Sequence, residues 1–379
     1  MEAVLSAEPF ASAKGDLKIT RVSAREYRWK RDVPISNGLH TYAHHDVSFV
    51  QVETDAGITG YGVGRPKAAE RAFRSEFGNA IVGRDPLMIE AIWKDLWSPK
   101  LHGRRGMETR ALSGIDMALW DIRCKVAGMP LYKLAGGYRR NVPVYTAGGY
   151  YAPGKGLKEL QQEMVGYVEL GSRAVKMKVG AVSITEDVER VRAVRAALGP
   201  DIKLMVDANC AYRSYQAISL ARRIEDQDIF WFEEAVQPDD YEGFKRIAAA
   251  SSITQATGEN EYTKHGFRDL IDTHAIGILQ PDVRYTGGVT EFIKIAAMAD
   301  ANGLDICPHG EQMAHLSLLG AIPNALMLEY YPHKVGSAYQ DVFLHAAKIN
   351  ADGTVTAPDV PGIGCDPNED VLRTLEQFA

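Results

Sequence analysis

Three acidic residues recur at equal spacing in the second half of the chain. Asp207, Glu233 and Glu259 each follow a short apolar run, and the intervals 207 to 233 and 233 to 259 are both 26 residues. Three converging carboxylates repel one another and raise their own pKa values unless a cation lies between them. Because oxygen ligands alone favour Mg2+ or Mn2+, we predict a magnesium site here. The alternative stays open that each acid caps a helix or forms an ion pair.

Two lysines stand in the apolar run that precedes these acids. Lys176 and Lys178 are one residue apart, so on a strand both side chains point to the same face. Their neighbours Val175, Met177 and Val179 are apolar, which favours a buried position over a solvated pair at a strand end. Two adjacent ammonium groups lower each other's pKa, so we expect one lysine to accept a proton.

Asn209 and Asn260 follow the same apolar runs as Asp207 and Glu259. Three further apolar runs are followed by Asp282, His309 and Glu329. Asp282 and His309 follow two successive runs. A carboxylate in that place would hold the imidazole and raise its basicity, as in other oriented acid–base pairs.

The elements that must position these residues form an alternating pattern. The apolar runs are 142–146, 174–179, 203–206, 229–232, 253–256, 276–279, 305–307 and 326–328. Helical patterns separate them, so eight strands and about seven helices predict an α/β fold, a (β/α)7β TIM-like barrel. Strands buried on both faces explain the continuous apolar runs. The alternative is a doubly wound open sheet.

The first part of the chain has a different pattern. Alternating segments 17–29, 47–54 and 58–63 predict strands, and 109–127 predicts a helix with one apolar face. We expect an α+β capping domain that the turn-rich C-terminal segment completes. The predicted units are a loose tail (1–15), the capping domain (16–140), the barrel (141–335) and the C-terminal segment (336–379).

One loop of the capping domain is a candidate lid over the barrel mouth. The segment 34–45 carries side chains that could bind hydroxyl groups or a distal carboxylate, namely Asn37, His40, Tyr42, His44 and His45. The alternative is that they are exposed side chains of a surface loop and bind no ligand. Arg104 and Arg105 are further candidates for binding a second carboxylate.

Composition excludes several classes of function. The net charge of −6 argues against a nucleic-acid partner, and the sequence has no apolar run near 18 residues, so we expect no membrane span. The first residues lack the pattern of a secretory signal. The four cysteines form no CxxC pair, so we expect buried free thiols in a cytoplasmic protein.

Several motifs together resemble the enolase superfamily, and within it the mandelate racemase subgroup. They are KMK (176–178), VDAN (206–209), WFEE (231–234), TGEN (257–260), QPD (280–282) and PHG (308–310). Segments 147–155, 307–313 and 359–364 look closest to the acid-sugar dehydratases, such as D-tartrate dehydratase. One departure is Ala235-Val236, where the family usually has proline after the paired glutamates; it changes a loop and no ligand.

The resemblance implies a role for each candidate residue. Glu233, the first of the paired glutamates, would be the metal ligand. Lys178 would be the base on one face of the substrate, and His309 with Asp282 the acid–base group on the other. The residues in contact with the substrate carboxylate or the developing enediolate would be Lys176, Asn209 and Glu329.

The resemblance also implies an activity. We expect one Mg2+ per subunit, a homo-oligomer, and a hydro-lyase that removes the α-proton of a small sugar acid and eliminates the β-hydroxyl to give a 2-keto acid. A racemase, epimerase or cycloisomerase would use the same residues. A non-catalytic sugar-acid binding protein is the alternative from another class, since a fold alone does not specify a function.

Overall fold

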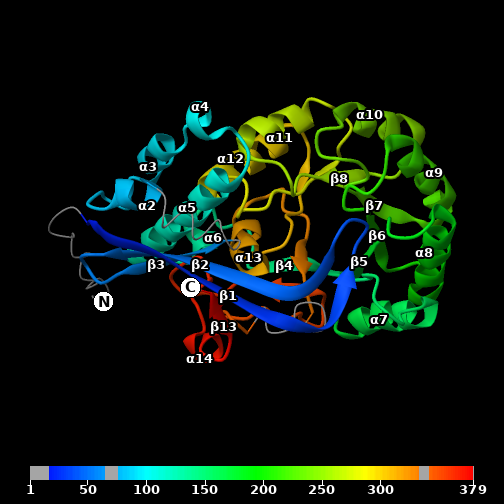
Figure 1. The fold of residues 1–379 in the computed structure, drawn as a ribbon, viewed down its shortest axis with the longest axis horizontal. Helices are drawn as coiled ribbons and strands as arrows, with labels where there is room; N and C mark the ends of the chain where they lie inside the picture. The colour runs from blue at the N-terminus through cyan, green and yellow to red at the C-terminus, as the bar shows by residue number, and fades with distance from the viewer. Residues whose placement is uncertain (1–16, 65–75, 333–340, 379) are drawn as a thin grey trace, which may run out of the picture.

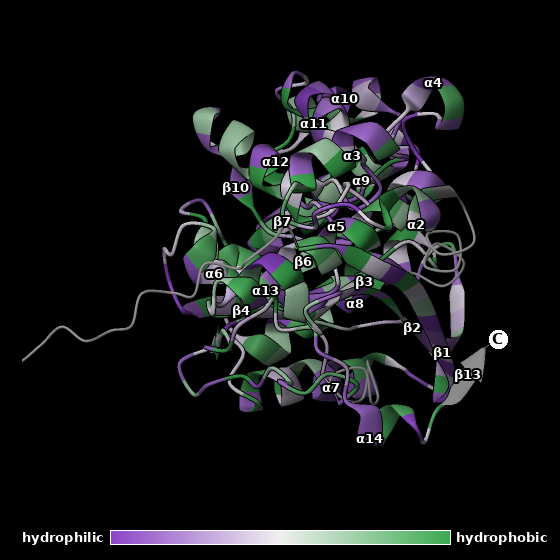
Figure 2. Ribbon diagram, turned by 90° about the vertical axis from the view of Figure 1, so that its left-hand side faces the viewer, coloured by the Kyte–Doolittle hydropathy of each residue, from purple (hydrophilic) through white to green (hydrophobic). Residues whose placement is uncertain are grey.

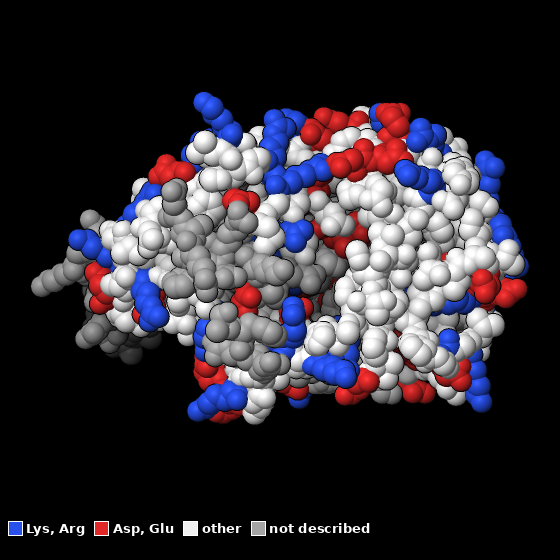
Figure 3. Space-filling model, viewed as in Figure 1, with Lys and Arg blue, Asp and Glu red and all other residues white. Residues whose placement is uncertain are grey.

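The computed structural model describes residues 17–64, 76–332 and 341–378, so the predicted tail 1–15 lies outside the described residues. The chain forms a capping layer of strands and helices beside a larger α/β body (Figure 1). Charged residues of both signs are interspersed over the face shown in Figure 3. In the described part of the chain, no helix is both long and apolar enough to cross a membrane.

The capping sheet is antiparallel, with strand order β13-β1-β2-β3. Its strands are β1 (Ile19–Ser36), β2 (Thr41–Thr54), β3 (Thr59–Gly64) and β13 (Glu376–Phe378). The helices beside it are α2 (Glu76–Ile81), α3 (Ile89–Leu96), α4 (Pro99–His102), α5 (Met107–Val126) and α6 (Leu131–Leu134). Helix α5 lies so close to β3 that a Cβ on Gly62 would come within 2.0 Å of the Gly114 carbonyl oxygen. Glycine at this position therefore permits the packing.

The body is a closed barrel of parallel strands. They are β4 (Asn141–Ala147), β5 (Ala174–Lys178), β6 (Lys203–Asp207), β7 (Ile229–Glu233), β8 (Gln255–Thr257), β9 (Ile278–Leu279), β10 (Asp305–Ile306) and β11 (Leu328–Tyr330). They pair in the order β10-β9-β8-β7-β6-β5-β4-β11. A parallel bridge from Ile306 to Ala325 joins the two ends, with Ile306 N donating to Asn324 O at 2.9 Å. The predicted barrel is confirmed, and the open sheet is excluded.

In the part of the chain that the structure describes, seven helices of nine or more residues surround the strands. They are α7 (Leu157–Glu169), α8 (Ile184–Leu198), α9 (Ser214–Ile224), α10 (Tyr241–Ala250), α11 (Thr263–Ile271), α12 (Val289–Ala301) and α13 (Gln312–Ala321). A short 3-10 turn, η1 (Glu225–Gln227), follows α9. Figure 2 shows polar and apolar residues on the same helices, for example α3 and α12. Inside the barrel, the rings of Tyr145 and Trp231 pack edge to face with their centres 5.1 Å apart. Buried apolar side chains therefore fill the barrel interior below the carboxyl ends of the strands.

The C-terminal segment contacts both parts of the molecule. Strand β12 (Thr354–Thr356) pairs with β4, helix α14 (Glu369–Leu372) follows, and β13 pairs with β1. Ile363 N also donates to Asp121 Oδ1 of α5 at 2.8 Å. The sequence predicted the return to the capping domain but missed β12. The unit boundaries at 140 and 335 stay a proposal.

Three predicted strands begin two residues before the observed ones. The structure has β8 at Gln255–Thr257, β9 at Ile278–Leu279 and β11 at Leu328–Tyr330, where the apolar runs were 253–256, 276–279 and 326–328. Ile253 is buried but precedes the paired residues. Apolar character therefore marks burial and does not fix the residue at which the continuous pairing of a strand begins. The four cysteines are buried and free, as predicted.

Candidate metal and acid–base site

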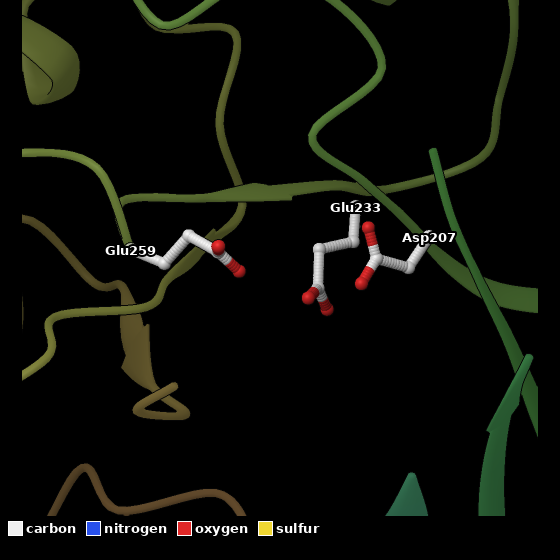
Figure 4. Close-up of side chains that lie close together, drawn as sticks. All are labelled: Asp207, Glu233 and Glu259. Atoms are coloured by element: carbon white, nitrogen blue, oxygen red, sulfur yellow. The ribbon is translucent and has the colours of Figure 1, made fainter. Parts of the chain in front are cut away.

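The three predicted acids converge at the carboxyl ends of neighbouring strands. Asp207 and Glu233 are the last residues of β6 and β7 and lie opposite each other in the parallel register. Glu259 follows β8 by two residues. One ligand oxygen from each lies within 4.8 Å of the others, and the side chains point toward one another (Figure 4).

Glu233 is held by donors from three strands and loops. Lys176 Nζ donates to Oε1, while Trp231 Nε1 and Gln280 Nε2 donate to Oε2 at 3.0 and 2.6 Å. Burial and the neighbouring Asp207 raise its pKa well above the usual value, and the lysines do not offset this. The donors fix the direction of the carboxyl group, and because burial and Asp207 disfavour its ionised form, a cation bound beside it would be stabilising.

Asp207 is the ionised member of the cluster. It accepts hydrogen bonds from Lys178 Nζ and from Asn209 N, the latter at 2.8 Å. Burial acts to raise its pKa, but Lys178 and Lys176 outweigh burial and hold the pKa below the usual value. The same contact acts on Lys178: burial lowers the lysine pKa, yet Asp207 raises it above the usual value overall. Lys176 does lower the Lys178 pKa, as expected, but the carboxylates outweigh this contribution.

Lys176 lies fully buried below the rim. Its Nζ is 2.8 Å from Glu329 Oε1 and 3.4 Å from Asp207 Oδ2, and it stands 5.2 Å from the centre of the Tyr145 ring. Glu329 also accepts Gly310 N at 2.6 Å. Burial acts to raise the Glu329 pKa, but Lys176 and His309 bring it down to about 2. Glu329 is therefore an ionised link between Lys176 and the loop that carries His309.

Glu259 completes the test of whether these residues suit a divalent cation. Burial and the adjacent Glu234 raise its pKa to about 8. Among the described residues, none donates a hydrogen bond to its buried Oε2, and His309 Nε2 approaches it only to 3.5 Å. A buried carboxylate oxygen without a donor is costly. The donor set, all carboxylate, and this orphaned oxygen both suit Mg2+.

The predicted His309–Asp282 pair is present. His309 Nδ1 lies 3.1 Å from Asp282 Oδ2. Arg284 also binds Asp282, with Nε 2.9 Å from Oδ1 and Nη2 2.5 Å from Oδ2. Burial lowers the His309 pKa, but Glu259 and Asp282 raise it above the usual value. Because Nδ1 faces Asp282, Nε2 is the atom directed at the acids.

A cavity of about 320 Å³ opens beside the acids. Its lining residues are Asn37, Leu39, His40, Tyr42, Tyr150, Lys178, Asn209, Cys210, Glu234, Gln237, Pro238, Glu259, Asn260, Tyr285 and His309. Lys178 enters from β5 and His309 from the loop after β10. In the closed barrel these strands are separated by β4 and β11 on one side and by β6 to β9 on the other, so the two side chains approach from different sides. Lys176, Asp282 and Glu329 are not lining residues.

The predicted lid segment forms the β1–β2 hairpin, whose tip reaches the cavity. Ser36 and Tyr151 exchange backbone hydrogen bonds of 2.8 and 2.9 Å, which dock the hairpin on the loop after β4. Asn37 Oδ1 accepts Leu39 N and His40 N, and Asn37 Nδ2 donates to Tyr42 OH at 3.1 Å. Three of the five side chains predicted here therefore line the cavity.

The other predicted ligand-binding residues lie elsewhere. His45 is buried and stacks on Trp29 at 5.3 Å, and burial lowers its pKa to about 3. His44 is exposed on β2 and lies outside the lining. Arg105 binds Asp239 and Glu261, so protein carboxylates already occupy it, and Arg104 is exposed outside the cavity lining.

Sequence reasoning missed the residues that orient the acids. Trp231 precedes Glu233 by two positions, and Arg284 follows Asp282 by two. Gln280 stands two positions before Asp282 and reaches Glu233 instead. The period of two along a strand was the signal available for Trp231, since i and i+2 share a face.

Comparison with known proteins agrees with this geometry. Residues 19–136 match the family model for the mandelate racemase / muconate lactonizing enzyme N-terminal domain, and residues 159–371 match the enolase C-terminal domain-like model. The chain is 35% identical to an arabinonate dehydratase of Saccharolobus solfataricus over 88% of this chain and 91% of that protein. It is also 35% identical to a 3,6-anhydro-alpha-L-galactonate cycloisomerase of Streptomyces coelicolor, over 91% and 96% of the two chains.

Among solved structures, a racemase from Streptomyces coelicolor with bound magnesium superposes with a TM-score of 0.87 at 34% identity, covering 94% of this chain and 99% of that one. The first family model covers the capping domain and the second covers most of the barrel, and the match with this structure includes both parts. The chain belongs to the enolase superfamily, in its mandelate racemase subgroup.

Proposed function

We propose that the chain is a magnesium-dependent dehydratase of a small sugar acid, aldonic or aldaric. The observation that carries the proposal is the convergence of Asp207, Glu233 and Glu259 beside a cavity that Lys178 and His309 line from different strands. The relatives named above take sugar acids according to their names. The cavity has the volume of about ten water molecules, which suits an acid of roughly four to six carbons.

The three acids would hold one Mg2+ per subunit. A cation between Asp207, Glu233 and Glu259 would relieve the raised pKa values of the two glutamates and give Glu259 Oε2 a partner. When bound, the ion would stabilise the negative charge that develops on the substrate carboxylate as the α-proton leaves. Once the charge of Asp207 is compensated, the cause of the raised Lys178 pKa is reduced.

Lys178 and His309 perform the proton transfers in this proposal. Lys178, as the free amine, takes the proton from C2 and becomes an ammonium, and the C–H electron pair moves into the carboxylate to give an enediolate. His309, protonated and oriented by Asp282, gives its Nε2 proton to the β-hydroxyl, so the C3–O bond breaks and water leaves. The resulting enol tautomerises to a 2-keto acid. The two roles exchange for a substrate of opposite configuration at C2.

The remaining predicted residues support the charge that develops. Asn209 lines the cavity beside Asp207, and we assign it a contact with the substrate. Lys176 supplies a fixed positive charge below the reacting carboxylate, and Glu329 keeps that ammonium in place at 2.8 Å.

Racemisation, epimerisation or cycloisomerisation is the second candidate function. Two proton-transfer groups on different sides of one cavity permit return of the proton to the opposite face of C2, and one relative is named a cycloisomerase. Incubation with aldonic and aldaric acids and Mg2+, followed by measurement of 2-keto acid, separates the candidates. Deuterium exchange at C2 in D2O without keto product would favour the second. Neither product nor exchange across the panel would contradict both.

A further inference from the structure

We infer that His315, a residue outside the cavity lining, positions the Asp282–His309 pair by joining the two loops that carry it. The inference rests on the proposed function, because it concerns the pair assigned to the second proton transfer. His315 lies on α13 and is fully buried. It does not line the cavity, so it acts through its neighbours and touches no substrate.

The His315 ring bridges the two loops with one hydrogen bond at each of its nitrogens. Nε2 lies 3.0 Å from the backbone nitrogen of Val283, which follows Asp282 in the loop after β9. Nδ1 lies 2.7 Å from the carbonyl oxygen of Gly310, which follows His309 in the loop after β10. Each partner is therefore the chain neighbour of one member of the acid–base pair.

The two partners fix the charge and the tautomer of the His315 ring. A backbone N–H only donates, so Nε2 accepts the hydrogen bond from Val283. A carbonyl oxygen only accepts, so Nδ1 carries the ring proton and donates it to Gly310. Burial agrees with a neutral ring, because it lowers the His315 pKa to about 4. His315 is therefore a neutral link and not an acid or a base.

The loop after β10 is held closely against the loop after β9. Gly310 also donates its backbone N–H to Glu329 Oε2 at 2.6 Å, so both of its backbone polar groups are bound. A Cβ on Gly310 would come within 2.4 Å of Arg284 Nη2, so the two loops are in close contact there. The His315 ring packs against the Phe292 ring of α12, with the ring centres 5.7 Å apart. His315 therefore fixes the spacing of two loops that already touch.

The spacing of the loops matters because it sets the geometry of the acid–base pair. Asp282 Oδ2 and His309 Nδ1 lie 3.1 Å apart, and this contact directs His309 Nε2 toward the acids. A displacement of about 1 Å in a reacting group can cost about 100-fold in rate. Loss of the His315 bridge should therefore slow the proton transfer assigned to His309 more than the transfer assigned to Lys178 on β5.

Two substitutions remove the bridge to different extents. His315→Phe keeps an aromatic ring against Phe292 and removes both hydrogen bonds. His315→Gln keeps a side-chain oxygen that can accept from Val283 N. Gln255→Met is the matched control, because Gln255 is also buried and binds two backbone groups, neither of which belongs to the loops of the pair.

The first measurement needs no substrate and uses proton–nitrogen NMR of histidine-labelled protein. We expect His315, identified by the signals missing from its variants, to be neutral with the proton on Nδ1 between about pH 6 and 8. The His309 signals should shift in the His315 variants and keep their positions in Gln255→Met. A charged His315 or its Nε2–H tautomer would overturn the inference. So would His309 signals that stay in place in the His315 variants, or that shift equally in the control.

The second measurement compares the two proton transfers, in D2O with Mg2+ and a sugar acid that the wild type converts. We expect His315→Phe to lower kcat for 2-keto acid at least about ten-fold. The ratio of C2 exchange to keto acid should change in the same direction as in His309→Asn. His315→Gln should lie between this variant and the wild type, and Gln255→Met should keep the wild-type ratio.

The outcomes separate the positioning role from the proposed reaction. Wild-type kcat and ratio in the His315 variants would overturn the inference, and the glutamine variant alone decides this where the phenylalanine variant does not fold. A ratio that changes in the direction opposite to that of His309→Asn would also overturn it. A wild type that forms no keto acid, while the His309 signals respond to His315 as expected, would refute the dehydratase and leave the positioning role standing.

Discussion

Glu233 is oriented by two neutral donors besides its lysine, and these donors decide how well the carboxylate is prepared for a cation. Trp231 Nε1 and Gln280 Nε2 both bind Oε2, which leaves Oε1 facing Lys176. Groups that orient a metal ligand commonly affect metal affinity although they do not touch the metal.

Gln280→Met should weaken Mg2+ binding about 10- to 100-fold, because it removes one donor to Glu233 at nearly constant volume. Isothermal titration with Mg2+ measures the change. Gln255→Met is the matched control, since Gln255 is equally buried but donates to the backbone oxygens of Phe244 and Ala275. Unchanged Mg2+ affinity in the Gln280 variant would contradict the role assigned to this donor.

Lys178→Ala should lower C2 deuterium exchange and keto-acid formation by at least about 100-fold, because the proposed base is lost. Mg2+ should bind at least as tightly, since Asp207 loses a competing ammonium. Exchange followed by NMR in D2O and Mg2+ titration check the two effects. Lys203→Ala, at the opposite end of β6, should change neither. Retained exchange in the Lys178 variant would refute the assignment.

At the level of single residues, the sequence predicted the acids and not their electrostatics. Asp207, Glu233 and Glu259 were recognisable because a polar residue at the end of a buried strand must lie at the barrel rim. The raised pKa of Lys178 could not be recognised from the sequence, because it depends on which residue of the neighbouring strand the side chain contacts. His45 was misassigned because stacking on Trp29 is a contact between strands that no local pattern reveals.

Helix α8 connects the loops that follow three barrel strands. Its buried Asp187 accepts hydrogen bonds from Gly180 N (2.7 Å), Tyr212 OH (3.0 Å) and Tyr151 OH (2.5 Å). Arg190 on the same helix donates to the carbonyl oxygen of Lys178 at 2.8 Å. One helix turn therefore fixes the loops after β4, β5 and β6, and through Tyr151 the docked hairpin.

Asp187→Asn should lower the free energy of unfolding by about 1 to 3 kcal/mol, because an amide nitrogen cannot accept the hydrogen bonds that the lost oxygen accepted. Urea unfolding followed by circular dichroism measures this. Glu189→Gln, a change of the same kind at an exposed position of α8, should be within about 0.5 kcal/mol of the wild type. Equal free energies of unfolding for the two variants would contradict the stabilising role assigned to the hydrogen bonds of Asp187.

At the level of elements, the alternation of apolar runs and helical patterns predicted the barrel and the number of its strands. The Ser183–Glu186 capping box at the start of α8 has a sequence pattern typical of a helix N-terminus. Strand register could not be predicted in the same way. Glu329 lies inside β11, whereas the sequence placed it after the strand, because the preceding segment 325–327 is equally apolar.

The capping layer is joined to the barrel through a buried carboxylate. Asp116 of α5 accepts Thr290 N at 3.0 Å and Thr290 Oγ1 at 2.5 Å, at the start of α12. Trp93 Nε1 donates to Gly287 O in the same junction at 2.8 Å. Burial raises the Asp116 pKa to about 7, although the bonds from Thr290 oppose the shift.

The raised pKa of Asp116 makes the free energy of unfolding depend on pH. Because the folded pKa lies above the unfolded one, the contribution of Asp116 is fully present below pH 4 and is lost as pH rises toward 7, by at most about 1.4 kcal/mol per pH unit. Asp116→Asn removes the titration. In thermal unfolding between pH 4 and 8, the Tm of the variant should therefore rise relative to the Tm of the wild type as pH increases. Parallel curves for the two proteins would contradict the prediction.

For the whole molecule, the sequence predicted two layers and the return of the C-terminal segment. It did not predict the contacts between the layers, which join residues far apart in the chain, such as Asp116 and Thr290. The homo-oligomer stays a prediction.

The pairing of β13 with β1 has a consequence for biosynthesis. Strand β13 pairs with β1 at Glu26–Arg28, so this part of the outer edge of β1 has no partner strand until residues 376–378 have been translated. An open strand edge is a template for association with other chains. A ribosome-bound nascent chain must therefore carry this exposed edge until residues 376–378 emerge, and β13 joins the cap only after the barrel has been synthesised.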